Sequence, residues 1–293
     1  MANLKAIRNR IGSVKNTQQI TRAMKMVAAA KLRRAQDALM QGRPYAQGLA
    51  ETIQRLAVSV DEELHPLMQR SDSTRTLLVV VTSDRGLCGA FNSSINRAAE
   101  ALIKEKLGTE FESVDLAIIG RKGNDYLRRR TEKLGTRIEH FFQDVYTDLS
   151  IETVKEICDV LTSDFVEGKY DQVYVLYNEF KSAIAQETQV ERLLPLSPDE
   201  LGNEDAESIE DYDFEPAPKE LFSYLLPLYI NKQVYRILQE SVASEMGARM
   251  TAMDSATNNA SDLIAKLTLE FNRARQAAIT TEIIEIVSGA NAL

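Results

Sequence analysis

Apolar and small residues recur along the first forty residues in alternating steps of three and four. The positions are Leu4, Ile7, Ile11, Val14, Thr21, Ala28, Leu32, Ala35 and Leu39, with polar interruptions between some of them. This spacing is typical of the seam of a coiled coil. Gly12 and Gly42 are the only glycines before Pro44, which is the first proline of the chain. We therefore expect one helix from about Leu4 to beyond Leu39.

The same spacing returns in the last third of the chain and holds without a slip. The positions are Met246, Met250, Met253, Thr257, Ala260, Ile264, Leu267, Phe271, Ala274, Ala278 and Thr281. From Leu228 to Ser288 there is no proline, and Gly247 is the only glycine before Gly289. This predicts a helix of about 60 residues, far longer than a globular domain needs. Since neither long helix has another evident partner in the chain, we expect the two to pair as an antiparallel coiled coil.

Three short apolar runs, rich in β-branched residues, lie between these helices at 76–81, 114–119 and 173–177. Helical stretches follow the first two runs, and a helix over about 151–166 precedes the third. Strands that alternate with helices favour a parallel sheet with helices on both faces. The expected fold class is α/β, with a central Rossmann-like domain and a long antiparallel coiled coil of the N- and C-terminal helices.

Charge and composition complete the expected division of the chain. Residues 199–220 carry ten Asp and Glu against Lys219 alone, with two prolines, as in a solvated loop. We expect an N-terminal helix at 1–55, a central α/β domain at 70–195, an acidic loop at 196–220 and a C-terminal helix at 221–293. Tyr212 and Phe214 are aromatic residues within the acidic loop, which is typical of a docking segment.

The loops after the first two strands contain the glycines that a nucleotide site would need. They are Gly86 and Gly89 in the first loop and Gly120 and Gly123 in the second. Their spacing matches neither the dinucleotide pattern G-x-G-x-x-G nor the phosphate loop G-x-x-x-x-G-K-[ST]. Ser83 and Cys88 lie in the first loop, but neither histidine is close to them in sequence to act as a base. We expect tight turns here, with no catalytic residue and no cofactor.

The two cysteines, Cys88 and Cys158, lie far apart and lack the spacing of a metal site or a disulfide framework. No apolar run approaches the roughly 20 residues that a membrane-spanning helix needs. We therefore expect no metal site and no direct insertion into a membrane, so that any membrane association would go through a partner.

The N-terminal helix is strongly basic, with ten Lys and Arg against the single acid Asp37 in residues 1–43. A nucleic-acid-binding arm and a mitochondrial transit peptide share this character. The helical pattern, however, passes Leu39 without a break like a cleavage site, and no aromatic residue interleaves the basic ones before Tyr45. The charge is better explained by an acidic surface alongside the helix.

Three stretches of the chain resemble the gamma subunits of bacterial F-type ATP synthases. They are IRNRIGSVKNTQQITRAMKMVAAAKLRRAQ at 7–36, SDRGLCGAFN at 83–92 and ARQAAITTEIIEIVSGA at 274–290. The resemblance implies that the terminal helices form an asymmetric shaft inside a hexamer of alternating alpha and beta subunits, with the α/β domain at its foot. It also implies a rotor that makes no bonds itself. Proton flow turns a membrane ring of c subunits, the ring turns the shaft, and the shaft drives the catalytic beta subunits through their states.

The resemblance also implies contact residues. Shaft contacts to the beta subunits fall on Met24, Arg275, Gln276, Thr280 and Glu282, and foot contacts near the ring and the epsilon subunit fall on Tyr212 and Glu215. The regulatory cysteine pair of the chloroplast relatives is missing, which speaks against a thiol switch. The implied location is peripheral, on the cytoplasmic face of the bacterial plasma membrane. A mitochondrial or plastid origin is the alternative, which the lack of a transit peptide disfavours.

Two other function classes stay open at this stage. A nucleotide-binding α/β enzyme would bind nucleotide as the isolated chain. A nucleic-acid-binding adaptor would bind DNA or RNA with a steep dependence on salt. The resemblance favours the rotor subunit over both.

Overall fold

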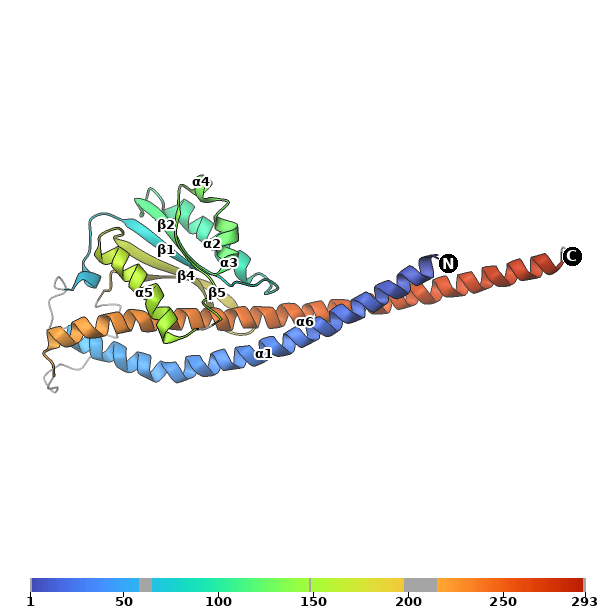
Figure 1. Ribbon diagram of the computed structural model, residues 1–293, viewed down its shortest axis with the longest axis horizontal. Helices are drawn as coiled ribbons and strands as arrows, with labels where there is room; N and C mark the ends of the chain where they lie inside the picture. The colour runs from blue at the N-terminus through green and yellow to red at the C-terminus, as the bar shows by residue number, and fades with distance from the viewer. Residues whose placement is uncertain (1, 58–64, 148, 198–214, 292–293) are drawn as a thin grey trace. The chain divides into compact units, whose positions relative to one another are not determined.

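The computed structural model describes residues 2–57, 65–147, 149–197 and 215–291. The chain forms two compact units, with residues 1–30 and 249–293 in unit 1 and residues 31–248 in unit 2. Two helices contribute to both units: α1, Ala2–Ala57, and α6, Pro218–Asn291 (Figure 1). The two predicted terminal helices are thus confirmed. None of the helices within the described ranges is long and apolar enough to cross a membrane.

Both long helices continue through a proline, Pro44 in α1 and Pro227 in α6. A proline inside a helix removes one backbone hydrogen bond and costs about 3 kcal/mol. In α1 the helix after Pro44 buries Leu49, Ile53 and Leu56 in the core of unit 2. That burial of apolar surface offsets the cost, so the helix runs on to Ala57.

In unit 1 the two helices lie side by side and antiparallel. The contacting pairs are Arg8 with Phe271, Gln18 with Ser261, Thr21 with Thr257 and Lys25 with Asp254. Residue numbers rise on α1 as they fall on α6, which is the pairing that the two repeats predicted. The positions of the 3.5-residue repeat are the buried ones in the middle of this seam, as at Ala28, Met253, Ala260 and Leu267.

Unit 2 contains a five-stranded sheet in the order β3-β2-β1-β4-β5. Its strands are β1 Arg75–Val81, β2 Ser113–Ile119, β3 Ile138–Phe142, β4 Gln172–Phe180 and β5 Gln186–Leu194. The pairs β1–β2, β1–β4 and β2–β3 are parallel, as predicted, whereas β5 is antiparallel to β4. The sheet is therefore mixed at one edge. The three apolar runs of the sequence correspond to β1, β2 and β4.

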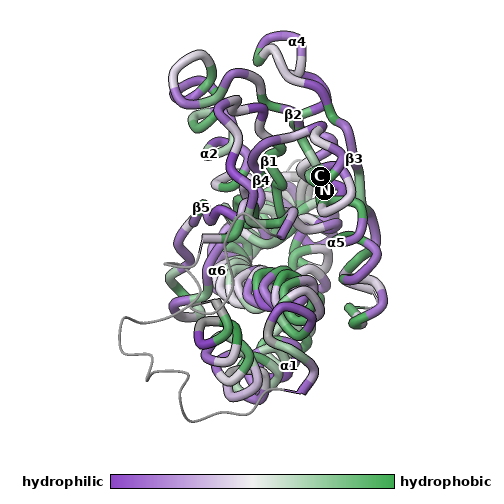
Figure 2. The backbone as a smooth tube through the Cα atoms, turned by 90° about the vertical axis from the view of Figure 1, so that its left-hand side faces the viewer, coloured by the Kyte–Doolittle hydropathy of each residue, from purple (hydrophilic) through white to green (hydrophobic). Residues whose placement is uncertain are grey.

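Helices cover both faces of this sheet, which confirms the predicted layers. One face carries α2 Phe91–Lys106, followed by the short helices α3 Arg121–Leu127 and α4 Thr131–Leu134. The other face carries α5 Ile151–Val166, the turn η2 Pro66–Met68 and the unit 2 parts of α1 and α6. Along β1, Leu78 and Val80 face the first core, whereas Leu77, Val79 and Val81 face the second. Figure 2 shows β1 as a green, apolar strand between these layers.

Candidate subunit-interaction surface

Three polar pairs occupy successive turns of the seam in unit 1. The Gln18 amide donates to the Ser261 hydroxyl at 2.6 Å, and the hydroxyls of Thr21 and Thr257 share a hydrogen bond of 2.8 Å. The Lys25 ammonium lies 2.5 Å from Asp254. Polar pairs within a coiled-coil seam give up burial but specify which residues lie opposite one another. The pairing of α1 and α6 therefore has a single register.

These polar pairs were not predicted from the sequence, although the apolar repeat of α1 contains a sign of them. The apolar repeat of α1 skips two positions, and they are the positions of Gln18 and Lys25. The structure shows that polar residues take the place of apolar ones there and meet polar residues of α6.

The last turns of α6 extend past the start of α1. Arg8 lies over the ring of Phe271, and α1 begins at Ala2, so the antiparallel register ends near Ala278. We predicted that Thr281 would lie in the seam. This prediction is wrong, because the seam ends before Thr281 and its side chain is exposed. Beyond the seam, apolar side chains that are 47–71% exposed follow one another: Ile279, Ile283, Ile284, Ile286 and Val287. A helix end with this much exposed apolar surface marks a contact site for another chain.

Four of the five predicted shaft residues lie on the last turns of α6, two just before the end of the seam and two beyond it. Arg275, Gln276, Thr280 and Glu282 are all exposed, and the Thr280 hydroxyl donates to the Gln276 carbonyl at 2.9 Å. Met24 is half-buried on α1, next to the Lys25–Asp254 pair. Asp254 and Arg275 are about 30 Å apart along α6 at 1.5 Å per residue. The structure therefore groups the four α6 residues and sets Met24 apart from them.

Polar and apolar residues share the sides of this helix end. In steps of three and four, one side carries Arg275, Ile279, Glu282 and Ile286, and the next carries Gln276, Thr280, Ile283 and Val287. We call residues 275–287 the distal α6 surface. The isoleucines were not among the predicted contact residues, but the run EIIEIV carries more apolar residues than a one-sided seam needs.

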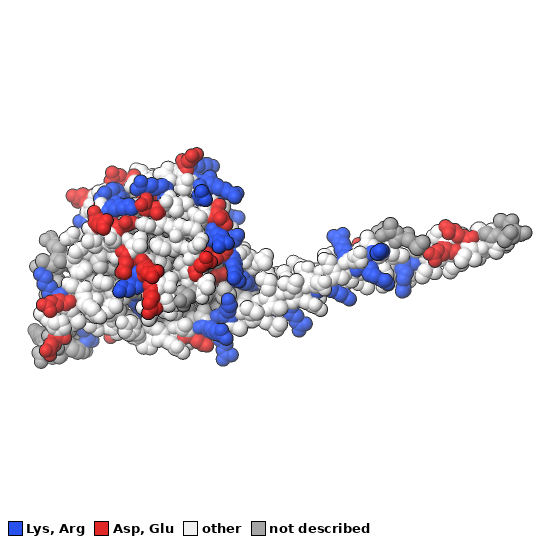
Figure 3. Space-filling view, viewed as in Figure 1, with Lys and Arg blue, Asp and Glu red and all other residues white. Residues whose placement is uncertain are grey.

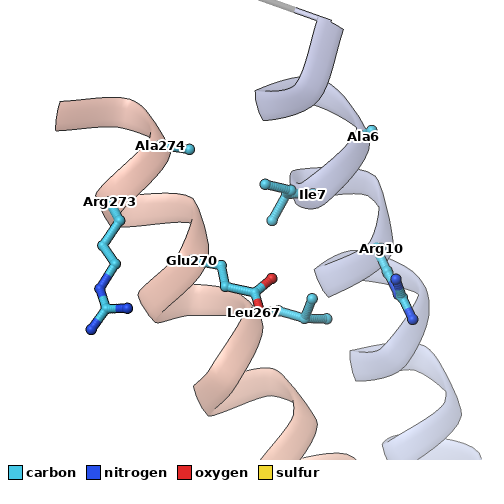
Figure 4. Close-up of a pocket in the computed structure, with 7 residues that line it drawn as sticks. All are labelled: Ala6, Ile7, Arg10, Leu267, Glu270, Arg273 and Ala274. Atoms are coloured by element: carbon cyan, nitrogen blue, oxygen red, sulfur yellow. The ribbon is translucent and has the colours of Figure 1, made fainter. Parts of the chain in front are cut away.

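A groove of about 520 Å³ lies between the two helices just before the distal α6 surface. It is lined by Ala6, Ile7, Arg10, Leu267, Glu270, Arg273 and Ala274. Figure 4 shows Ile7 and Leu267 pointing into the space between the helices, while Arg10 and Arg273 point away from it. The groove has an apolar floor, and Glu270 lies beside it together with the two arginines.

Charge on the paired helices is unevenly distributed. Residues 2–30 of α1 contain Lys and Arg but no Asp or Glu, and most of these basic side chains are exposed. In Figure 3 blue side chains are spaced along the paired helices of unit 1, and red ones gather close to the end of α6. Glu282 and Glu285 lie on the last described turns of α6, and their side chains are exposed. A basic side of this kind fits an acidic partner.

Of the two predicted foot residues, Glu215 lies at the edge of the described part of unit 2. Glu215 is exposed and lies shortly before the start of α6. Tyr212 lies outside the described residues.

The glycine loops at the carboxyl ends of β1 and β2 pack against each other. Gly120 has φ +96°, and a Cβ atom there would lie 2.2 Å from the Thr82 carbonyl oxygen. The Gly123 N–H donates to the Thr82 hydroxyl at 2.8 Å. In the first loop the Ser83 hydroxyl donates to the Arg85 carbonyl at 2.7 Å. These glycines serve turns and close packing, as the sequence predicted.

Both cysteines are buried, and neither is in a disulfide bond. Burial raises the pKa of the Cys158 thiol to about 12, so this thiol is protonated at neutral pH. Within the described ranges, no group of three or more His, Cys, Asp or Glu is arranged to hold a metal ion.

Comparison with known proteins places the whole chain in one family. The family model described as ATP synthase matches residues 3–293. The ATP synthase gamma chain of Geobacter sp. (strain M21) is 51% identical over 293 residues, which is 100% of this chain and 99% of the relative. The ATP synthase gamma chain of Geobacter metallireducens is 50% identical with the same coverage.

Solved structures agree with these relatives. A chain from the central stalk and c-ring of the Tetrahymena thermophila mitochondrial ATP synthase is 30% identical, with a TM-score of 0.61. The match covers 81% of this chain and 99% of that one. A chain from the Euglena gracilis mitochondrial ATP synthase shares the fold with a TM-score of 0.66, covering 99% and 94% of the two chains, at 19% identity.

Proposed function

The chain belongs to the ATP synthase gamma family, and from this premise we propose that it is the central-stalk rotor subunit of a proton-translocating F-type ATP synthase. It couples rotation of a membrane ring of c subunits to conformational cycling of the catalytic beta subunits. The observation that carries the proposal is the distal α6 surface. It exposes isoleucines and charged residues on one helix end, and a contact surface of that kind needs a partner chain to cover it.

The surface suits a rotor because its sides differ. One side alternates Arg275 and Glu282 with isoleucines, and the adjacent side presents uncharged Gln276 and Thr280, followed by Ile283 and Val287. A hexamer of alternating alpha and beta subunits presents three copies of the same beta surface around one shaft. Each beta subunit therefore meets a different side, and differential contacts of about 1–3 kcal/mol are enough to bias its conformation.

We assign Met24, Arg275, Gln276, Thr280 and Glu282 to contacts with the beta subunits. The acid-free side of α1 in unit 1 supports this assignment, because it complements acidic loops on the surrounding subunits. The fixed register of the polar seam supports the mechanism as well, since a shaft whose helices slid past each other would not present a defined side.

We assign Tyr212 and Glu215 to contacts with the c-ring and the epsilon subunit at the foot. In this proposal the chain itself is non-catalytic and holds no cofactor. The second glycine loop supports that reading, because Gly120 and Gly123 pack on Thr82 and leave no open space for a phosphate there. The proposed location is peripheral, on the cytoplasmic face of a bacterial plasma membrane.

The experiment that tests the proposal is reconstitution with alpha and beta subunits. We expect the chain to co-purify with them in a complex that hydrolyses ATP, and to restore ATP-driven proton pumping when the remaining subunits are added in vesicles. The isolated chain should show no ATP hydrolysis. ATP turnover by the chain alone, or failure to join the alpha and beta subunits, would contradict the proposed role.

A further inference from the structure

The β4–β5 hairpin of unit 2 contacts α6 at three levels. Arg236 of α6 contacts Glu191 of β5, and the Ser244 hydroxyl donates to the carbonyl of Asn178 in β4 at 2.9 Å. At the hairpin tip, a Cβ atom on Gly247 would lie 3.2 Å from the Cα of Ala183. Residues 236, 240, 244 and 247 follow one another in steps of four, four and three, which places them on one side of α6. This side is the polar stripe of α6.

Arg236 is the centre of the charged contacts in the polar stripe. Its guanidinium lies 2.5 Å from Glu191 and 3.1 Å from Glu240, and it donates to the Tyr177 hydroxyl at 3.3 Å. The Tyr177 hydroxyl in turn donates to Glu191. Burial by itself would lower the pKa of Arg236, but the charge of Glu191 and the Tyr177 hydroxyl raise it. The guanidinium therefore stays charged while it joins the helix to both strands of the hairpin.

Apolar residues make up a second part of the contact between α6 and the sheet domain. Phe222, Leu226, Ile230, Val234 and Leu238 are buried in the core at intervals of four residues. Apolar attraction has no direction, and side chains spaced by four residues follow a row that is inclined to the helix axis, so this row alone does not specify which strand residues lie opposite it. A cavity of about 310 Å³ also lies between β5 and α6, with Arg236, Gln233 and Leu193 in its wall. Apolar packing is thus incomplete beside the charged network.

We propose that the β4–β5 hairpin is a clamp that fixes the rotational setting of α6 on the sheet, with Arg236 as its main positioning residue. A partly exposed ion-pair network of this kind contributes little net stability, but the planar fork of the guanidinium holds both carboxylates in a defined geometry. Torque that enters unit 2 must reach α6 through contacts that resist rotation, and the polar stripe provides them. This inference rests on the proposed rotor function.

The test uses vesicles that contain the complete complex. In the variant Arg236→Met/Glu191→Gln/Glu240→Gln all three members of the network are neutral, so none of its charges is left without its partner. We expect this variant to assemble and to hydrolyse ATP at the wild-type rate, but to sustain a several-fold smaller proton gradient. The matched control is Arg130→Met/Glu100→Gln, which neutralises an ion pair of 2.7 Å elsewhere in unit 2. The control should sustain the wild-type gradient.

If the triple variant does not assemble, a conservative variant tests whether the β4–β5 hairpin fixes α6. In Arg236→Lys the charge remains, but a single ammonium replaces the forked guanidinium that reaches Glu191 and Glu240 at once. We expect it to give an intermediate gradient. A wild-type gradient in the triple variant, or in Arg236→Lys when the triple variant fails to assemble, overturns the clamp. Loss of pumping by the wild-type chain would instead contradict the rotor function, so the two failures are distinguishable.

Discussion

Gly120 holds a backbone conformation that other residues rarely adopt, at the point where the second glycine loop meets the first. Its φ is +96°, and the Thr82 carbonyl leaves no room for a side chain. We expect Gly120→Ala to lower the free energy of unfolding by about 3 kcal/mol, through backbone strain and displacement of Thr82. Urea unfolding followed by circular dichroism measures this change.

Gly168 supplies the control for Gly120. Its φ is +73°, and a Cβ atom there would meet nothing within 4 Å. Gly168→Ala should therefore cost only about 1 kcal/mol, from backbone strain alone. Equal losses in the two variants would show that the contact with Thr82 has no part in the effect.

Asp171 makes the stability of unit 2 depend on acid pH. The guanidinium of Arg75 donates to both carboxylate oxygens of Asp171, at 2.9 and 3.0 Å, and holds its pKa at about 2, below the ordinary 3.8. Because the folded-state pKa is depressed, this stabilisation is present above about pH 4 and is lost as pH falls through about 2. It amounts to about 2 kcal/mol.

We expect Asp171→Asn to lower the free energy of unfolding by about 2 kcal/mol at pH 7. The difference from the wild type should shrink between about pH 4 and pH 2, where the wild-type carboxylate is itself protonated. Unfolding curves over this range check the prediction. A difference that does not vary with pH would mean that Asp171 acts through packing and not through its charge.

At the scale of elements, the helices and strands that have a long periodic or apolar pattern could be predicted from the sequence. The two long helices, their antiparallel pairing and the strands β1, β2 and β4 were predicted, because each has either a sustained repeat or a continuous apolar run. The strands β3 and β5 were missed. In β5 only the last two residues, Leu193 and Leu194, are fully buried, and the polar run before them reads as a loop. An edge strand is defined by its neighbour's hydrogen bonds, which sequence periodicity does not report.

The candidate surface was predictable to a similar extent. The resemblance placed Arg275, Gln276, Thr280 and Glu282 on the last turns of α6, and the structure shows them exposed there. The exposure of the isoleucines among them depends on where α1 begins relative to α6. That offset is a property of the tertiary pairing and cannot be read from the repeat. The repeat alone therefore predicted a seam that continues to Thr281.

The register of the paired helices can be tested by crosslinking. Thr21 and Thr257 are in contact across the seam, so Thr21→Cys/Thr257→Cys should form a disulfide under mild oxidation. Cys88 and Cys158 are buried and should contribute little background. Mobility on non-reducing gels reports the bond.

Thr268 provides the control for this crosslink. It lies on α6 about 16 Å further along the helix than Thr257, so Thr21→Cys/Thr268→Cys should stay reduced. Equal crosslinking of both pairs would mean that the helices do not keep one register.

At the scale of the whole molecule, Arg275 and Glu282 test whether the distal α6 surface acts in coupling. Both side chains are exposed, so Arg275→Ala and Glu282→Ala should change the free energy of unfolding by less than about 0.5 kcal/mol. We expect each variant to lower ATP-driven proton pumping in the reconstituted complex, because contacts formed at one rotary angle are lost. Unchanged pumping in both variants would mean that Arg275 and Glu282 only face solvent and take no part in coupling.

The exposed isoleucines of α6 also bear on how the cell must produce this chain. Until a partner covers them, they offer an apolar patch to any other newly made copy, and such patches promote aggregation and attract proteases. Synthesis of the chain therefore has to keep pace with synthesis of the subunits that receive it. Overproduced alone, the chain should accumulate in the insoluble fraction or be degraded, whereas balanced co-production should keep it intact.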